Sequence, residues 1–285
     1  MRKGIILAGG SGTRLYPSTL AISKQIIPIY DKPMIYYPLS VLMQAEIKNY
    51  LVISTPDHIS SFERLLGDGS FLGINISYKI QKSPNGIAES FLLAKDFLAG
   101  SHAALILGDN IFYGSNIEDI LISASNEKNQ NTIFATKVSD PERFGVIEFD
   151  DENQAVSIEE KPKDPKSNYV VTGLYFYDSD VTHIAGELKL SERGELEITD
   201  LNKKYLSQKN LHVQILPEGF VWLDTGTPES LFEASSFVKT IEKKQGIKIC
   251  CPEKIAIEKN WVTKDEVLRN IKKVDNSYTN FIKNL

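Results

Sequence analysis

A buried strand that runs straight into a glycine-rich turn constrains this chain more than any other feature. The apolar run Ile5–Ala8 predicts a parallel strand. Three of the next four residues are glycines, which allow a sharp turn whose backbone N–H groups can approach an anion. Arg14 and Lys24 follow and add permanent positive charge suited to phosphate oxygens. The first 25 residues therefore predict a site for a polyphosphate.

This loop differs from the commonest phosphate-binding loops. The chain contains no G-x-x-x-x-G-K-[ST] sequence, which excludes a P-loop. A dinucleotide fingerprint needs a third glycine where Leu15 stands, so that match is incomplete. A glycine turn without any ligand remains an alternative. Two cations near the carboxyl end of a strand favour the anion site over it.

Composition and charge limit the class of protein. The chain has 285 residues, 42% hydrophobic and 24% charged, which suits either one large globular domain or a domain with a small extension. Its net charge of −5 argues against nucleic-acid binding through bulk electrostatics. The adjacent Cys250 and Cys251 predict no disulfide framework and favour a reducing cytoplasm. No apolar run approaches about 18 residues, and the chain enters a core strand at once, so we expect neither a membrane span nor a signal peptide.

The first two thirds of the chain alternate strand and helix patterns. We expect strands at Gly4–Ala8, Tyr50–Thr55, Ile74–Ile80, Ala103–Gly108, Asn131–Lys137 and Val170–Tyr177. We expect helices at Met34–Ala45, Ile59–Leu66, Gly86–Ala99 and Ile117–Asn126. This order predicts an α/β fold, a Rossmann-like three-layer αβα arrangement around a mixed, mainly parallel central sheet. Ligands of such a sheet bind beyond the carboxyl ends of its strands.

The rest of the chain lacks this regular alternation of strands and helices. Short strands at Gly145–Phe149 and Ala155–Glu159 predict a small β insertion around an acidic turn. Further elements are expected as a helix at Ile198–Leu206, strands at Val213–Leu216 and from Trp222, and helices at Pro228–Lys244 and Lys264–Lys272. We therefore predict a core over residues 1–240 and a C-terminal helical extension over residues 241–285 that regulates or braces an assembly.

Two aspartates stand where strands end. Asp109 follows the apolar run Leu105–Leu107, and Asp224 follows Trp222–Leu223. Two carboxylates that meet over a triphosphate would hold one Mg²⁺, with phosphate oxygens and water as its other ligands. Each aspartate alone is as well explained as a turn or capping residue. Together with the glycine loop they favour the metal site.

Other polar segments fit a base and a sugar phosphate. Gln81 offers a donor and an acceptor to a pyrimidine edge, and Gly86 lets the backbone come close to it. Glu160 could accept sugar hydroxyls, and Lys161 and Arg193 could hold a phosphate. Each segment also has a structural alternative. Gln81 and Gly86 could belong to a polar loop, Glu160 and Lys161 to a solvated charge cluster, and Arg193 to a surface loop before a helix.

These pieces, in this order, resemble the sugar nucleotidylyltransferases, and among them the bacterial thymidylyltransferases. The resemblance spans residues 4 to about 253 and rests on the segments Leu7–Leu15, Ser23–Gln25, Asp31–Pro38, Leu107–Asn110, Glu159–Pro162, Val171–Asp178, Arg193–Asp200 and Trp222–Thr227. It implies that dTTP and α-D-glucose 1-phosphate give dTDP-glucose and pyrophosphate, as the first step of a dTDP-L-rhamnose type of deoxysugar synthesis. The set is specific, although the glycine loop alone is shared with uridylyl relatives.

The resemblance also implies roles for individual residues. Arg14, Lys24, Asp109 and Asp224 would be catalytic, and the two aspartates would hold Mg²⁺. The nucleotide would be bound by Leu7, Gly9, Gly10, Gly12, Thr13, Arg14, Lys24, Gln25, Gln81 and Gly86. The sugar phosphate would be bound by Asn110, Gly145, Glu160, Lys161, Val171 and Arg193. Phe144 departs from the pattern, because relatives often carry tyrosine there and its hydroxyl is lost.

Regulation and assembly come only from the resemblance. It implies a cytoplasmic homotetramer that is feedback-inhibited by dTDP-rhamnose at a second site, with Cys251 and Glu253 in that region. Three other functions remain as alternatives: a transferase for UTP or another sugar, a catalytically silent nucleotide-sugar sensor, and an NAD-dependent dehydrogenase. The sensor would be expected to lack a member of the catalytic set, and the dehydrogenase would need the full fingerprint.

Overall fold

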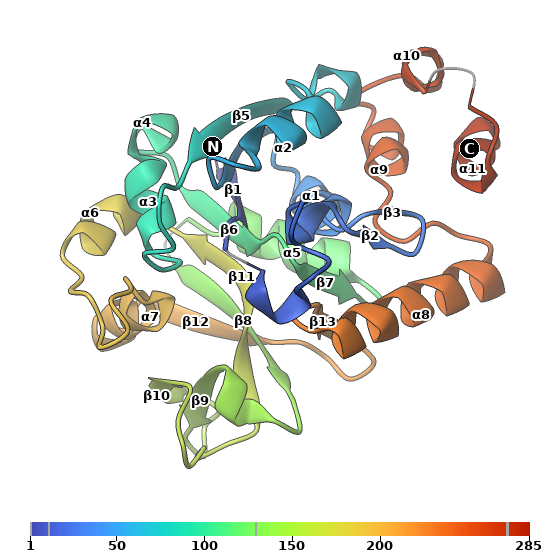
Figure 1. The fold of residues 1–285 in the computed structure, drawn as a ribbon. Helices are drawn as coiled ribbons and strands as arrows, with labels where there is room; N and C mark the ends of the chain where they lie inside the picture. Colours follow the sequence, from blue (N-terminus) through green and yellow to red (C-terminus); the bar gives the residue numbers. More distant parts are fainter. Residues whose placement is uncertain (1, 11, 129, 272–273) are drawn as a thin grey trace.

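The computed structural model describes residues 2–10, 12–128, 130–271 and 274–285. A mixed sheet, nine-stranded in the described part of the chain, forms its centre, with a main path β10-β9-β11-β6-β1-β4-β5 (Figure 1). Four neighbours in this path are parallel: β6 (Ala103–Leu107), β1 (Lys3–Ala8), β4 (Asn49–Ser54) and β5 (Asn75–Ile80). Their carboxyl ends consequently share one edge of the sheet.

The direction of the sheet reverses at β11 (Tyr169–Tyr177). This strand is antiparallel to β6, and on its other side it pairs with β8 (Asn131–Lys137) and β9 (Gly145–Phe149). A parallel strand, β12 (Leu211–Ile215), adds to β8. The hairpin of β9 and β10 (Ala155–Glu160) projects from the sheet and is the expected β insertion (Figure 1).

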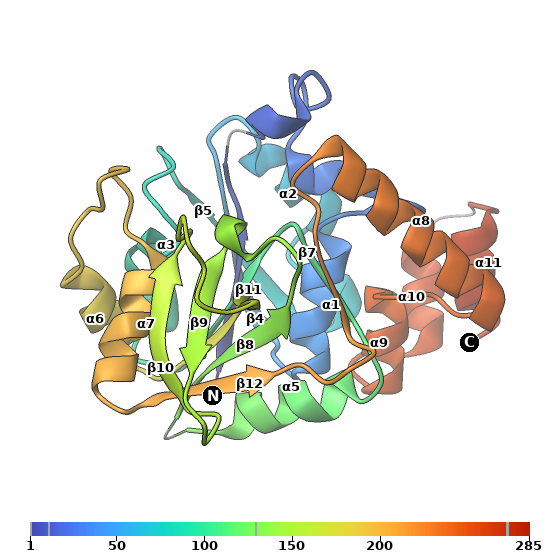
Figure 2. The same cartoon turned by 90° about the horizontal axis from the view of Figure 1, so that it is seen from below.

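Helices cover both faces of the sheet, because successive side chains of a buried strand point to opposite sides. Ile6 packs in a core with helices α1 (Tyr36–Gln44), α2 (Ile59–Leu66) and α5 (Ile117–Asn126). Its neighbour Ile5 packs in a separate core with α3 (Glu89–Leu93), α4 (Lys95–Leu98), α6 (Val181–Gly186) and α7 (Ile198–Ser207). The expected three-layer αβα arrangement is confirmed, and Figure 2 shows both helical layers around the strands.

Two small sheets lie beside the main one. The strands β7 (Asn110–Tyr113) and β13 (Val221–Asp224) pair antiparallel, with Asp224 opposite Asn110. The strands β2 (Pro28–Ile29) and β3 (Lys32–Pro33) form a short hairpin that packs on the long helix α8 (Pro228–Gln245). Pairing of β7 with β13 brings two distant parts of the sequence together at the edge where β6 ends.

The C-terminal residues form three short helices with a small apolar core of their own. These are α9 (Pro252–Glu258), α10 (Lys264–Asn270) and α11 (Ser277–Lys283), packed around Cys251, Val267 and Ile282. In Figure 1 they gather on the opposite side of the molecule from the β9–β10 hairpin. The helix expected to reach Lys272 ends at Asn270, and Lys272 lies outside the described residues. No described helix is long and apolar enough to cross a bilayer.

One predicted helix differs clearly from the structure. The expected Gly86–Ala99 helix begins only at Glu89 and is interrupted at Ala94, which gives the separate helices α3 and α4. Gly86 has φ +104°, a left-handed conformation that a helix cannot contain. The short elements β2, β3, β7, α6, α9 and α11 were not predicted. Most other predicted bounds agree within two residues, which is the usual uncertainty at element ends.

Candidate active site

The predicted phosphate loop lies at the carboxyl edge of the parallel strands. Gly10 and Gly12 have φ of +96° and +59°, so the turn needs residues without a Cβ penalty. A 3₁₀ turn, Thr13–Leu15, follows and carries Arg14 over the edge, while Ser11 lies outside the described residues. The loop borders a cavity of about 230 Å³. Its lining residues are Gly9, Gly10, Gly12, Thr13, Arg14, Lys24, Gln25, Asp109 and Gly226.

A second cavity, of about 220 Å³, lies beside the first, between the glycine loop and the segment after β5. Its walls are Leu7, Gly9, Gly10, Gln25, Gln81, Pro84, Gly86, Ile87, Leu107, Asp109 and Glu195. Gln81 is buried, and a Cβ on Gly9 would stand 2.9 Å from Gln81 Oε1. The amide oxygen of Gln81 therefore lies against the glycine loop, at the wall of a slot suited to a flat ring.

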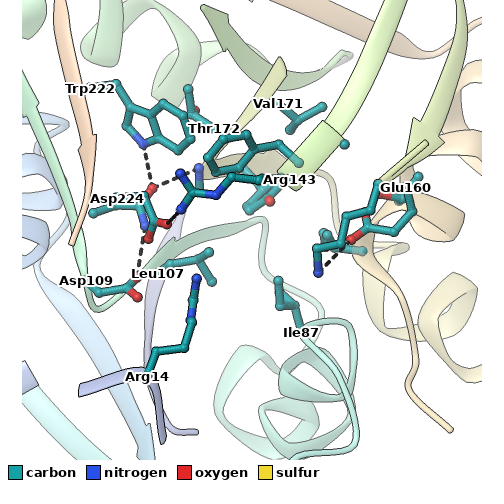
Figure 3. Close-up of a pocket in the computed structure, with 18 residues that line it drawn as sticks. Arg14, Ile87, Leu107, Asp109, Arg143, Glu160, Val171, Thr172, Trp222 and Asp224 are labelled. Carbon is teal, nitrogen blue, oxygen red and sulfur yellow. Dashed lines mark hydrogen bonds and ion pairs between the residues drawn. The ribbon is translucent and has the colours of Figure 1, made fainter. Parts of the chain in front are cut away.

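A third and larger cavity, of about 610 Å³, is shown in Figure 3. It lies between the glycine loop, the β9–β10 hairpin and β13. Its lining includes the predicted Arg14, Asp109, Asn110, Gly145, Glu160, Lys161, Val171 and Asp224. Asp109 lines this cavity and both smaller ones, so the three cavities share one carboxylate. The arrangement accommodates a ligand made of a ring, a phosphate chain and a polar second substrate.

Cationic side chains lie close to the carboxylates of Asp109 and Asp224. Lys24, only 8% exposed, donates from Nζ to Asp109 Oδ2 at 2.5 Å. Arg143 Nη2 lies 3.7 Å from Asp224 Oδ2, and in Figure 3 both side chains point into the cavity. A Cβ on Gly226 would lie 3.0 Å from both Arg14 Nη2 and Asp224 Oδ2. The predicted cations and aspartates thus meet at one place.

The surroundings of Asp224 disfavour the ionised form of its carboxyl group. Burial, and next the negative charge of Asp109, raise the pKa of the Asp224 carboxyl above its ordinary value of 3.8. The cations Lys24, Arg14 and Arg143 oppose this shift without cancelling it. Two carboxylates that repel each other in a partly dry site offer the hard oxygen ligands that a divalent cation prefers. No described group of three or more His, Cys, Asp and Glu residues forms a metal site, so these two carboxylates would supply only part of a coordination shell.

Asn110 connects Asp109 to the rest of the site. Its Nδ2 donates to Asp109 Oδ1 at 2.9 Å, while its Oδ1 accepts from Trp222 Nε1 at 2.6 Å and from the Gly173 N–H at 3.1 Å. A Cβ on Gly173 would stand 2.5 Å from that oxygen, so the contact requires glycine. Asn110, which we predicted on the sugar-phosphate side, is therefore also a fixed support for the Asp109 carboxylate.

Several predicted residues lie elsewhere or are held by neighbours. Arg193 does not line the large cavity; its Nη2 donates to both oxygens of Glu197 at 2.8 Å and to Glu160 Oε1 at 3.4 Å. Glu160 does line it and accepts from Thr199 Oγ1 at 2.5 Å. Cys251 and Glu253 lie in the C-terminal core, where Tyr278 donates to Glu253 Oε2 at 2.6 Å. The structure thus separates this pair from the cavities that share Asp109.

Sequence reasoning missed some of the lining residues. Arg143 was not proposed, although it adds a third cation to the aspartate pair. Its position directly before Phe144 and Gly145 was the available signal, since both neighbours were already under consideration. Thr199, Tyr175 and Thr172 also line the cavity, and their only signal was that they stand inside the segments Val171–Asp178 and Arg193–Asp200 that carry the resemblance.

The chain is similar to known proteins over most of its length. The family model for nucleotidyl transferases matches residues 3–241. A glucose-1-phosphate thymidylyltransferase from Neisseria gonorrhoeae is 56% identical over 93% of this chain and 92% of its own length. One from Mycobacterium tuberculosis is 49% identical over 98% of this chain and 97% of its own length.

A solved structure shares the fold as well. A provisionally named glucose-1-phosphate thymidylyltransferase from Bacillus anthracis, in complex with sucrose, superimposes with a TM-score of 0.77 at 40% identity, over 83% of this chain and 95% of that one. The chain belongs to the nucleotidyl transferase family.

Proposed function

We propose that this protein is a glucose-1-phosphate thymidylyltransferase. One observation carries the proposal: three adjoining cavities meet at Asp109, and they suit a base, a triphosphate and a sugar phosphate. The relatives at 49–56% identity with matching length carry that name. The reaction joins dTTP and α-D-glucose 1-phosphate to give dTDP-glucose and pyrophosphate.

The chemistry is a displacement at phosphorus. An oxygen of the sugar phosphate, already ionised at neutral pH, forms a bond to the α-phosphorus of dTTP. The bond from that phosphorus to the bridging oxygen of the β-phosphate breaks in line, and its electrons leave with pyrophosphate. No proton has to be removed from the nucleophile, so the site needs charge neutralisation and alignment more than a general base.

The cations have distinct tasks in this proposal. Arg14 lines both the glycine-loop cavity and the large cavity, so it can neutralise charge that grows on the leaving pyrophosphate. Lys24 faces the glycine loop and would orient the triphosphate. Arg143 and Lys161 line the large cavity and would draw in the sugar phosphate. Arg193 would join them only after exchanging its Glu197 partner for phosphate.

Asp109 and Asp224 would hold Mg²⁺, with phosphate oxygens and water as the other ligands. The raised pKa of Asp224 beside Asp109 supports this assignment, because a divalent cation relieves that repulsion. Bound there, the ion would neutralise phosphate charge and align the two substrates. Asn110 fixes the Asp109 carboxylate from behind.

The base and sugar ends would be held by polar contacts. The cavity of about 220 Å³ between the glycine loop and the segment after β5 is the proposed base slot. There Gln81 and Gly86 would contact thymine, and Leu7, Gly9 and Gly10 would cover its face. In the large cavity, Glu160 and the backbone at Gly145 and Val171 would face the sugar. Phe144 packs edge-on against Trp222 with ring centroids 5.1 Å apart, so the ring keeps a packing role without a hydroxyl.

We further propose that the protein is a cytoplasmic homotetramer. We also propose that dTDP-rhamnose inhibits it by feedback. Residues 241–285 would form the extension that carries the second site, near Cys251 and Glu253. The separate small core of that extension and the buried Glu253 carboxylate support a role apart from the chemistry. Size-exclusion chromatography with light scattering, and inhibition measured with dTDP-rhamnose, test these two points.

The substrate assignment is tested by pyrophosphate release with crossed panels of nucleoside triphosphates and sugar 1-phosphates, with and without Mg²⁺. We expect dTTP with glucose 1-phosphate to give the highest kcat/KM, and chelation of Mg²⁺ to stop the reaction. Faster turnover of UTP with another sugar phosphate would overturn the substrate assignment. No pyrophosphate release with any pair would overturn the reaction class.

A further inference from the structure

The buried Gln81 side chain faces the base slot, and its amide can present either an oxygen or an NH₂ group there. Only one of these suits a given base. The imide of thymine or uracil has an N–H at N3 and needs an acceptor, whereas cytosine has an unprotonated N3 and needs a donor. Whatever fixes the amide of Gln81 therefore decides which pyrimidines fit.

Glu89, in the first turn of α3, fixes that amide. Gln81 Nε2 donates to Glu89 Oε2 at 2.7 Å and to the Gly86 carbonyl at 3.5 Å. An ionised carboxylate only accepts hydrogen bonds, so the Gln81 nitrogen must face Glu89. The oxygen must then face the opposite way, and it lies against Gly9 in the base slot.

The Glu89 carboxylate is itself held in place. Its Oε1 accepts from Asn85 Nδ2 at 2.8 Å, so both oxygens are engaged. Asn85 belongs to the turn that carries Gly86, and a Cβ on Gly86 would stand 2.3 Å from the Leu196 carbonyl oxygen. One carboxylate consequently ties the turn, the helix start and Gln81 into a single rigid unit.

We propose that Glu89 is the positioning residue that restricts this enzyme to nucleotides with an imide base, thymine or uracil, and rejects cytosine. This inference rests on the proposed function for the location of the base, and it names the class of base that the slot accepts. Glu89 itself does not line the base slot. It acts through Gln81, by leaving only the amide oxygen available to the ligand.

The substitution Glu89→Gln tests this directly. A glutamine both donates and accepts, so the Gln81 amide gains a second orientation that presents NH₂ to the slot. We expect the kcat/KM preference for dTTP over dCTP to fall by about 10- to 100-fold, the range that one hydrogen-bond mismatch produces. The loss for dTTP should reside in KM, with kcat nearly unchanged, because the contact is remote from the reacting phosphorus.

A control variant and a binding experiment complete the test. Asp96→Asn removes an exposed acid from the neighbouring helix α4 and should leave the dTTP preference unchanged. Isothermal titration of N3-methyl-dTTP, which lacks the N3 proton, should give at least about tenfold weaker binding than dTTP in the wild type. In Glu89→Gln that gap should narrow.

Two results would overturn the inference. Equal loss of dTTP and dCTP activity in Glu89→Gln would mean that Glu89 only stabilises the start of α3. Unimpaired binding of N3-methyl-dTTP to the wild type would mean that the Gln81 oxygen does not meet N3. A wild type that prefers UTP would contradict the proposed thymidylyl function and leave this inference standing, because uracil carries the same imide.

Discussion

Replacement of Asp224 by asparagine should make the protein more stable and nearly inactive. The carboxylate is buried beside Asp109, and burial followed by that negative charge raises its pKa above 3.8. Asparagine keeps the shape and removes the repulsion, so we expect a gain on the order of 0.5–2 kcal/mol in the free energy of unfolding. In thermal unfolding each kcal/mol corresponds to about 2 °C for a chain of this size.

The activity of the same variant should fall on the order of 10³-fold in kcat, which is about 4 kcal/mol of barrier at 1.36 kcal/mol per tenfold. This loss follows because one of the two proposed Mg²⁺ ligands no longer carries charge. Pyrophosphate release at saturating dTTP and Mg²⁺ measures it. Asp96→Asn, an exposed change outside the site, is the matched control for both readouts.

The stability gain should also depend on pH. Because the folded-state pKa of Asp224 lies above 3.8, the folded protein holds a proton that the unfolded chain has already lost. The contribution of Asp224 to wild-type stability therefore declines as pH rises from about 3.8 through the folded-state pKa, and its full penalty is present above that pKa. The advantage of Asp224→Asn should vanish at low pH. A variant that melts below the wild type at pH 7 without Mg²⁺, or that turns over at the wild-type rate, would refute this account of the site.

Two further changes test the supports of the site. Gly86→Ala should destabilise the fold by about 2 kcal/mol or more, because its φ is +104° and the new Cβ would meet the Leu196 carbonyl at 2.3 Å; an unchanged chemical-denaturation midpoint would contradict this. Asn110→Ala should lower kcat about 10- to 100-fold and weaken the Mg²⁺ dependence, because the Asp109 carboxylate loses its orienting donor. A Mg²⁺ titration of the initial rate measures the second effect, and an unshifted half-saturation would show that Asn110 does not act through Asp109.

The sequence predicted the parallel half of the fold well because its signals are local. The strands β1 and β6 contain continuous apolar runs, and the ends of α2 and α5 follow from a clear helical periodicity. The same runs also placed the glycine loop, Asp109 and Gln81 at one edge, since parallel strands end on the same side. These positions needed no knowledge of distant contacts.

What could not be predicted depends on contacts between distant segments. The strand β7 exists because Asn110–Tyr113 pairs with Val221–Asp224; the second segment was predicted as a strand, but the short first segment was not. The helices α6, α9 and α11 have only six or seven residues each, too few for a clear period. Arg143 meets Asp224 only through the folded chain.

Arg193 shows a different limit of the sequence. It stands in a dense run of charges, and the sequence alone does not decide whether its partner is a ligand or a neighbour. In the structure Glu197, four residues further on and just before α7, accepts from Arg193 Nε at 3.1 Å and from Nη2 at 2.8 Å. A local ion pair thus occupies a side chain that family resemblance assigns to a phosphate.

An ion pair also holds Lys24 and Asp109 at the edge where the parallel strands end. Lys24 and Asp109 neutralise each other at 2.5 Å, so neither buried charge is left unpaired. In the proposed reaction each exchanges its partner for one of like sign: Lys24 takes a phosphate in place of a carboxylate, and Asp109 takes Mg²⁺ in place of an ammonium group. Binding of the polyanion and of the divalent cation should therefore favour each other, because either one alone would separate Lys24 from Asp109 and leave one of these two charges unpaired.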